Sequence, residues 1–106
     1  MIKARIAVPS SAAQGETIEI KTLVSHPMES GFRLDHSGEV IPRNIIERFE
    51  LYYLGKLMFT TRFGPGIAAN PYLSFMLEVT ESGIIEFAWY EQNGDVTRES
   101  REIVVQ

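Results

Sequence analysis

The 106-residue sequence contains no cysteine, and this absence limits the chemistry open to it. Without cysteine the chain has no disulfide, no thiolate nucleophile and no cysteine-ligated zinc or iron–sulfur site. The compartment stays open, because a cysteine-free chain fits reducing and oxidising surroundings alike. Function classes that depend on a thiol of this chain are therefore excluded.

Long apolar runs and clusters of basic residues are also missing. No segment approaches the roughly 20 apolar residues of a membrane-spanning helix, and residues 1–16 lack the apolar core of a signal peptide. Ten Lys and Arg against 14 Asp and Glu give a net charge of −4, and the basic residues are scattered. Since nucleic acid binding needs a clustered excess of positive charge, we expect neither a membrane nor a nucleic acid as partner.

What the sequence has in abundance is alternation of apolar and polar residues, the pattern of half-buried strands. Strands are predicted at residues 2–8, 17–24, 45–53, 57–63, 73–79, 84–90 and 96–105. Seven short strands in one small chain predict a single domain, residues 1–106, with an all-β fold. The expected architecture is an immunoglobulin-like antiparallel β-sandwich of about seven strands.

The last hairpin carries a turn signal, because Asn93-Gly94 fits a two-residue type I′ turn. Such a turn would place Trp89 opposite Arg98 and Phe87 opposite Ser100, and neither pair resembles core packing. We therefore expect the final strand to be a polar sheet edge, with its register left open by the sequence.

The candidates for catalysis and metal binding are weak. A triad of Ser25, His26 and Asp35 is disfavoured, because adjacent residues of an extended chain point to opposite sides. His26 and His36, with Glu29 and Asp35, lack the close ligand pairs typical of a metal site. Neighbouring carboxylates are expected among 14 acids and indicate a solvated surface. We expect no catalytic residue, no metal ion and no cofactor.

Apolar side chains on the outward faces of the predicted strands suggest an interface. The outward residues are Ile46, Tyr52, Met58, Met76, Ile84, Ala88 and Tyr90. An exposed sheet face usually carries Thr, Lys and Glu, whereas aromatic residues and methionines are enriched at protein contacts. We predict a partner-binding face that includes Tyr52, Met58 and Tyr90. Scattered residues that never join into a patch remain the alternative.

Two connections are long. One is opened by Gly64-Pro65-Gly66, without the following helix that an anion site requires. The other, residues 26–42, is predicted to be a docking loop. Its candidate partner-binding residues are His26, Met28, Glu29, Phe32, Arg33 and Arg43. A loop that instead packs its own Met28 and Phe32 against the sandwich end remains equally open.

An ordered string of residues in and after this loop is distinctive. It runs His26-Pro27-Met28-Glu29-Ser30-Gly31, then Asp35, Gly38, Ile41-Pro42-Arg43, Ile45-Ile46 and Phe49. In these residues the chain resembles the SoxZ family, the smaller subunits of the SoxYZ sulfur carrier of bacterial thiosulfate oxidation. Weaker similarity at residues 8–9, 15–16, 21–24, 69–72, 87–90 and 93–95 extends the resemblance along nearly the whole chain. The chain departs from the family pattern at residues 32–34 and 36–37.

The resemblance implies an immunoglobulin-like subunit without catalytic residues that forms a heterodimer with SoxY, whose C-terminal cysteine holds the sulfur intermediates. It also implies transient docking to Sox enzymes, among them a haem protein that loads thiosulfate and a hydrolase that releases sulfate. A periplasmic location, reached by co-export with a signal-bearing partner, is expected. Whether the isolated chain self-associates as a homodimer is left open by the sequence. Two alternatives remain: a stand-alone immunoglobulin-like ligand-binding or adhesion module, and a small metal-dependent redox enzyme.

Overall fold

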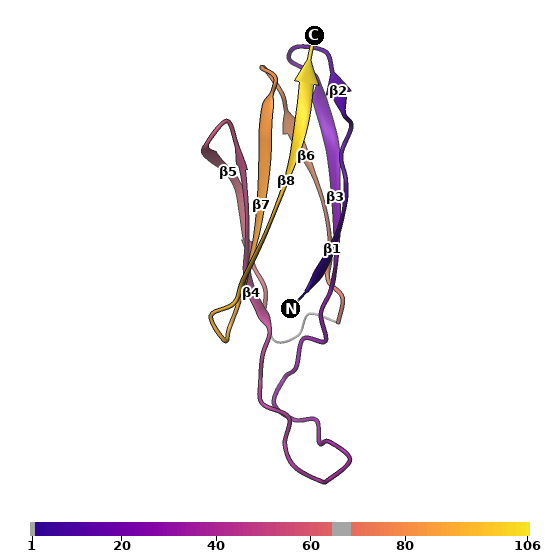
Figure 1. Ribbon diagram of the computed structural model, residues 1–106, viewed down its shortest axis with the longest axis vertical. Coiled ribbons are helices and arrows are strands. Elements are labelled where there is room, and N and C mark those ends of the chain that lie inside the picture. Colours follow the sequence, from indigo (N-terminus) through magenta and orange to yellow (C-terminus); the bar gives the residue numbers. More distant parts are fainter. Residues whose placement is uncertain (1, 65–68) are drawn as a thin grey trace.

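The computed structural model describes residues 2–64 and 69–106, which form two facing β-sheets (Figure 1). The strands are β1 (Lys3–Ala7), β2 (Ser11–Ala12), β3 (Thr17–Ser25), β4 (Ile46–Tyr53), β5 (Lys56–Arg62), β6 (Tyr72–Glu78), β7 (Gly83–Glu91) and β8 (Val96–Val105). Seven of them are the strands predicted from alternation. The two-residue β2 was missed, because a stretch this short carries no periodicity.

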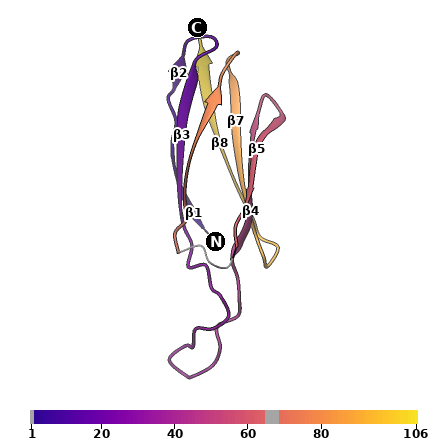
Figure 2. The ribbon, with the colours of Figure 1, turned by 180° about the vertical axis from the view of Figure 1, so that it is seen from behind.

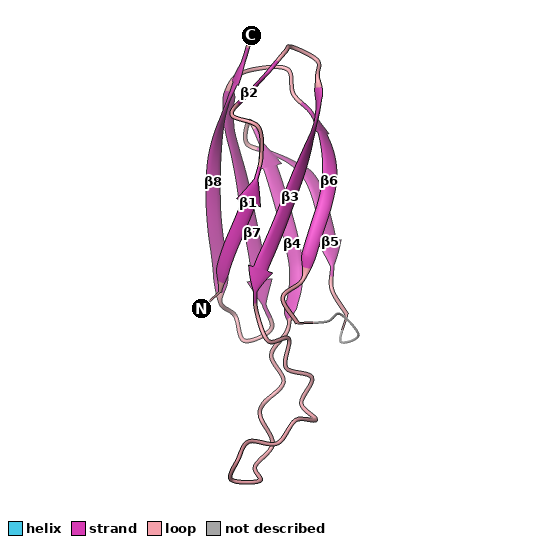
Figure 3. Cartoon of the chain, turned by 90° about the vertical axis from the view of Figure 1, so that its right-hand side faces the viewer, coloured by secondary structure: helices cyan, strands magenta, loops and turns pink. Residues whose placement is uncertain are grey.

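The smaller sheet has the order β1-β3-β6, and the larger one has the order β2-β8-β7-β4-β5 (Figure 3). Every pairing is antiparallel except the short parallel contact between β2 and β8. The prediction of an all-β, immunoglobulin-like antiparallel sandwich is confirmed. In the described ranges no helix has the length and hydropathy of a membrane span.

The core lies between the sheets and is centred on aromatic side chains. Phe49 of β4 packs with ring centroids 5.1 Å from Trp89 and 6.4 Å from Phe87, both of β7. Its ring also approaches Phe59 and Phe75, which stack on each other across the two sheets. Alternation predicts that Phe49 of β4 and Phe87 and Trp89 of β7 point inward, and their burial in this core confirms it.

A bulge in β4 changes which side Ile46 faces. The register with β7 shifts between Ile46 and Arg48, so one extra residue precedes Phe49. Strict alternation predicted that Ile46 points outward with Tyr52, but the bulge turns it inward and leaves it fully buried. The outward assignment of Ile46 was therefore wrong.

The turn between β7 and β8 has three residues instead of two. Glu91 and Asp95 flank it, with the Asp95 carbonyl accepting the Glu91 N–H at 2.8 Å, and Gly94 takes a φ of 99°. The extra residue slips the predicted register by one and pairs Trp89 with Thr97 and Phe87 with Glu99. Apart from its last two residues, which pair with β2, β8 forms an edge of the larger sheet, as its polar sequence predicted.

The connection from β3 to β4 extends away from the sandwich along the long axis of the molecule (Figures 1 and 2). The whole structure measures 57 × 19 × 19 Å, which reflects this projection. We call residues 29–44 the arm, since a backbone bridge joins Glu29 and Asn44 at its start and end. The other long loop, predicted at Gly64-Pro65-Gly66, reaches into positions 65–68, outside the described residues.

Candidate partner-binding surfaces

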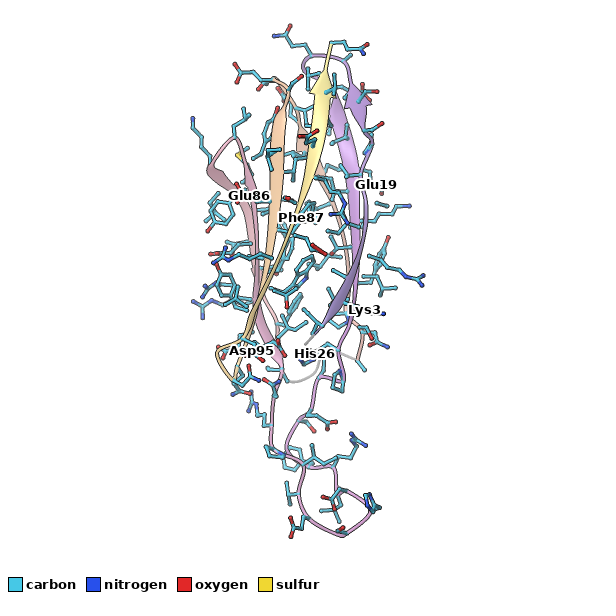
Figure 4. All side chains as sticks on the ribbon, viewed as in Figure 1. Lys3, Glu19, His26, Glu86, Phe87 and Asp95 are labelled. Carbon is cyan, nitrogen blue, oxygen red and sulfur yellow. The ribbon has the colours of Figure 1, made fainter. Side chains whose placement is uncertain are left out.

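The arm leaves the sandwich at His26, whose side chain is buried at the end of β3 (Figure 4). Its Nδ1 accepts the N–H of Met28 at 2.9 Å, and its Nε2 lies 2.8 Å from Oε1 of Glu91. Because Nδ1 uses its lone pair as an acceptor, the ring proton sits on Nε2 and is donated to Glu91. Through this bond His26 connects the end of β3 to β7.

Asn44 completes this junction from the returning strand of the arm. Its Nδ2 donates to Oε1 of Glu91 at 3.2 Å, and its Oδ1 accepts the N–H of Asn93 at 3.2 Å. Its backbone exchanges two hydrogen bonds of 2.9 Å with Glu29. Three segments, the start of the arm, its end and the β7–β8 turn, are thus tied together around one buried carboxylate.

Met28 fills the space beside this junction. Its side chain is 6% exposed, and its Sδ accepts the N–H of Ile46 at 3.3 Å. Asn70 holds the neighbouring backbone of His26 through its side-chain oxygen and its own N–H, at 2.8 and 2.7 Å. Of the two alternatives that the sequence left open for this loop, Met28 follows the packed one, whereas Phe32, which is 89% exposed, does not. We call His26, Met28, Glu29, Asn44 and Glu91 the arm base.

Glu29 and Arg33 form a pair on the first strand of the arm. Arg33 Nε donates to Oε2 of Glu29 at 3.1 Å, and Arg33 Nη2 donates to Oε1. The hydrogen bond from Arg33 lowers the pKa of Glu29, with the charge of Arg33 adding to the effect against the opposing effect of burial. The guanidinium, largely exposed, is therefore held along the arm.

The far end of the arm is a short hairpin with exposed apolar residues. Leu34 and Val40 form a bridge, and the Asp35 carboxylate accepts the N–H groups of Ser37 and Glu39 at 2.8 and 3.0 Å. Phe32 is 89% exposed. Of the loop residues proposed for partner binding, Phe32, Arg33 and Arg43 are on the surface, whereas His26, Met28 and Glu29 are buried.

The outer side of the larger sheet carries a polar network with two tyrosines. The Tyr52 hydroxyl donates to Oε1 of Glu50 at 2.9 Å, and the guanidinium of Arg48 lies 4.0 Å from the ring centre of Tyr90. Burial raises the pKa of Glu50, but the Tyr52 and Tyr90 hydroxyls and the positive charges of Arg48 and Arg98 outweigh it, so the pKa is lowered. The network presents flat, fixed aromatic and guanidinium groups to the outside.

Exposed apolar side chains surround this network. Strand pairing puts Leu57 opposite Tyr52 and Val96 opposite Tyr90, and Ile84 lies on the same side of β7. Leu57, Met58, Ile84 and Val96 are each between 40% and 49% exposed. We call the outward side of this sheet the sheet face: Arg48, Glu50, Tyr52, Leu57, Met58, Ile84, Tyr90, Val96 and Arg98. Tyr52, Met58 and Tyr90, predicted as partner-binding residues, thus lie together.

Besides Ile46, two residues that were predicted to point outward are not part of the sheet face. Ala88 is 1% exposed and forms the floor of a shallow depression of about 250 Å³, with Tyr52, Glu86 and Arg98 on its walls. Met76 is 60% exposed but lies on β6, in the opposite sheet. Alternation gave the correct side for Ala88 and could not show that its larger neighbours cover it.

Sequence reasoning missed Glu91, Asn44 and Asn70. Glu91 follows Phe87 and Trp89 in the inward phase of β7, so an acid at that position was a signal for a buried partner. The two asparagines act through distances of more than 40 residues and carried no local signal. Within residues 2–64 and 69–106, no group of three or more His, Cys, Asp or Glu is arranged to hold a metal.

Comparison with solved structures shows the same fold in proteins of low sequence identity. A superoxide reductase (neelaredoxin) from Ignicoccus hospitalis is 22% identical, with a TM-score of 0.73 over 97% of this chain and 80% of that one. The sulfur carrier protein SoxY from Chlorobium limicola f thiosulfatophilum is 13% identical, with a TM-score of 0.67 over 96% of this chain and 74% of that one. These similarities establish the sandwich alone.

The family assignment comes from the sequence itself. No curated protein sequence matches the chain. The sequence does match the SoxZ family, described as sulphur oxidation protein SoxZ, over residues 5–102. This range contains both the arm and the sheet face, and it confirms the resemblance carried by the motif that begins at His26. The chain belongs to the SoxZ family and is a component of the Sox sulfur-oxidation system.

Proposed function

We propose that this chain is the non-catalytic subunit of a sulfur carrier, and that it binds a SoxY-like chain bearing the reactive cysteine. Family membership supports the system, and the absence of cysteine from the sequence leaves the sulfur attachment to the partner. The sheet face is the observation that carries the proposal, because it offers a stable partner a broad apolar and aromatic surface. The periplasm, reached together with that partner, is the proposed location.

The composition of the sheet face suits a lasting protein contact. Tyrosine and arginine, with tryptophan, are the side chains most often found at the energetic centre of interfaces. Here Tyr52 is held by Glu50, and Tyr90 lies under the guanidinium of Arg48. Since these groups are already ordered in the free chain, little conformational freedom is lost on binding.

The buried residues of the arm base have a different role in this proposal. His26 and Met28 expose 3% and 6% of their surface, so they offer a partner almost nothing to touch. They act as positioning residues that fix the direction of the arm. Tyr52, Met58 and Tyr90 on the sheet face are the residues proposed to bind the SoxY-like chain, whereas Phe32, Arg33 and Arg43 on the arm are exposed and available to a further partner.

Co-expression with a SoxY-like chain tests the proposal. We expect a stable 1:1 complex in size-exclusion chromatography with light scattering. Tyr52→Lys and Tyr90→Lys each place a charge in the proposed contact, and we expect dissociation constants at least about tenfold higher with an unchanged melting temperature. Met76→Lys, on the opposite sheet, is the matched control and should leave the affinity unchanged.

Other outcomes contradict the proposal. Separate monomers after co-expression would refute the heterodimer and favour a stand-alone binding module. Unfolding of the tyrosine variants would mean that these rings stabilise the fold, and a second pair, Leu57→Lys and Val96→Lys, would then probe the same face from its more exposed residues. Weaker complex formation in Met76→Lys alone would indicate that the partner contacts the smaller sheet.

A further inference from the structure

The arm has one apolar face that is exposed to solvent. The backbone bonds from Ile41 N–H to the Arg33 carbonyl and from Asp35 N–H to the Glu39 carbonyl fix its register. The same register puts Phe32 opposite Pro42, next to the bridged pair Leu34 and Val40. Because residues two apart in a hairpin share a face, these four lie on one side. We call Phe32, Leu34, Val40 and Pro42 the arm face.

All four residues are exposed, and the arm that holds them is ordered. Phe32 is 89% exposed, Leu34 57% and Val40 59%. The Asp35 turn closes the tip, and the arm base fixes the other end through His26, Asn44 and Glu91. Binding to a preformed surface loses little conformational entropy, so a small contact on the arm face is enough for recognition.

The size of the arm face limits the kind of complex it can make. Covering it removes on the order of 400 Å² from water on this side, given that a whole aromatic side chain covers about 150–250 Å². Both partners together would bury about 800 Å², less than the roughly 1,200 Å² at which stable complexes begin. The arm face by itself therefore fits a transient contact and is too small for a lasting heterodimer or homodimer.

Charge indicates the surroundings of the complementary pocket. Residues 34–40 contain two carboxylates, Asp35 and Glu39, and no lysine or arginine. The positive side chains of the arm lie toward its base, where Arg33 is paired with Glu29 and the exposed Arg43 follows Pro42. An acidic tip beside an apolar patch is complementary to a pocket with a basic rim, and such charges mainly increase the association rate.

We propose that the arm face is a second docking surface, separate from the sheet face, for an enzyme that acts transiently on the carried sulfur group. This inference rests on the proposed function, since it assumes that the sheet face holds the cysteine-bearing chain. The enzyme offers an apolar pocket for the Phe32 ring with lysine or arginine at its edge. The arm then brings the enzyme to one end of the sandwich, while the carrier chain stays on the larger sheet.

The test uses the purified 1:1 complex with the SoxY-like chain and, as probes, the haem enzyme and the sulfate-releasing hydrolase of the same Sox system. Surface plasmon resonance measures enzyme binding by Phe32→Ala, Phe32→Leu and Met76→Ala complexes. We expect Phe32→Ala to weaken binding of at least one enzyme by about tenfold or more, with Phe32→Leu in between. Met76→Ala, at an exposed apolar residue of the smaller sheet and outside both proposed surfaces, should leave enzyme binding unchanged.

Two further measurements distinguish enzyme docking on the arm face from other occupants of that surface. The affinity for the SoxY-like chain should stay within about twofold in Phe32→Ala, and Glu39→Gln should slow enzyme association most at low salt. Weaker heterodimer formation in Phe32→Ala would assign the arm face to the stable interface and overturn the inference. Self-association that disappears in Phe32→Ala would make a second copy the occupant and also overturn it. Unchanged binding of both enzymes would do the same.

Failure of the underlying function gives a different result. If the unmodified chain forms no complex with the SoxY-like partner, the proposed function fails before any arm variant is measured. If the heterodimer forms but the arm variants leave enzyme binding unchanged, the proposed function stands and the inference fails. Melting temperatures of all variants are recorded alongside, and we expect no change for Phe32→Ala because its ring packs on so little of the chain.

Discussion

The base of the arm and its tip belong to one continuous loop, yet their side chains lie in opposite surroundings. At the base, His26 and Met28 are buried and bonded to β7 and β4. Ten and four positions later, His36 and Phe32 are exposed at the far end. The same residue types thus have structural roles at one end and surface roles at the other, and only the position in the fold separates them.

This contrast shows what the family motif does in this molecule. The string that begins His26-Pro27-Met28 supplies the residues that attach the arm, and Asn44 adds the last hydrogen bonds. Residues 32–34 and 36–37 lie at the exposed end of the arm. The residues that attach the arm therefore have a structural role, while those near its tip face outward.

The two histidines give the largest expected difference. His26→Ala removes the donor to the buried Glu91 and the acceptor for the Met28 N–H, and it leaves a cavity. Losing a hydrogen bond to a buried carboxylate, together with the cavity left behind, costs about 4 kcal/mol of unfolding free energy. His36→Ala, at the exposed tip, should change stability by less than about 0.5 kcal/mol. Urea denaturation of both variants measures the difference.

Equal unfolding free energies for His26→Ala and His36→Ala would contradict this comparison. Glu91→Gln supplies a further control, because an amide oxygen keeps an acceptor for His26 and Asn44 while the charge is removed. We expect its loss to be smaller than that of His26→Ala.

Much of the fold was predictable from residues whose effect is local. Alternation located seven strands and the inward positions of Phe49, Phe87 and Trp89, since side-chain direction in a strand follows from neighbouring residues alone. The errors arose where one residue was inserted. The bulge before Phe49 reversed Ile46, and the third turn residue before Asp95 shifted the last strand by one position.

The candidate surfaces were predictable only in part, for a related reason. Tyr52, Met58 and Tyr90 fall on one side of a sheet because their strands are neighbours, and alternation was sufficient to group them. The burial of His26 depends on Glu91, which is 65 residues away in the sequence. No local pattern around His26 distinguishes a docking residue from one that closes a junction between distant strands.

One apolar residue of the arm base, Met28, and one of the arm face, Phe32, give the next difference. Met28→Ala leaves a cavity at the end of the core and removes the acceptor for the Ile46 N–H, which should cost about 2–3 kcal/mol. Phe32→Ala removes a ring that is 89% exposed, and we expect a change below about 0.5 kcal/mol. Thermal denaturation followed by circular dichroism measures both. A clear loss from Phe32→Ala would mean that the ring packs on the chain and is not free for a partner.

The smallest expected difference concerns two glycines with positive φ, Gly31 at 91° and Gly38 at 83°. Alanine at either position adopts a disfavoured backbone conformation, which costs about 1 kcal/mol. At Gly38 the new Cβ meets open space, whereas at Gly31 it would lie 3.2 Å from Cβ of Arg43, on the opposite strand of the arm.

We therefore expect Gly31→Ala to lose about 1 kcal/mol more than Gly38→Ala, because it must also push the two strands apart near the arm base. Urea denaturation measures both variants, and backbone amide shifts report whether the strands separate. Equal losses would show that the arm absorbs the crowding by a small movement. The arm would then be less rigid near its base than the hydrogen bonds of His26 and Asn44 indicate, and its tip would lose the fixed direction on which docking by a small surface depends.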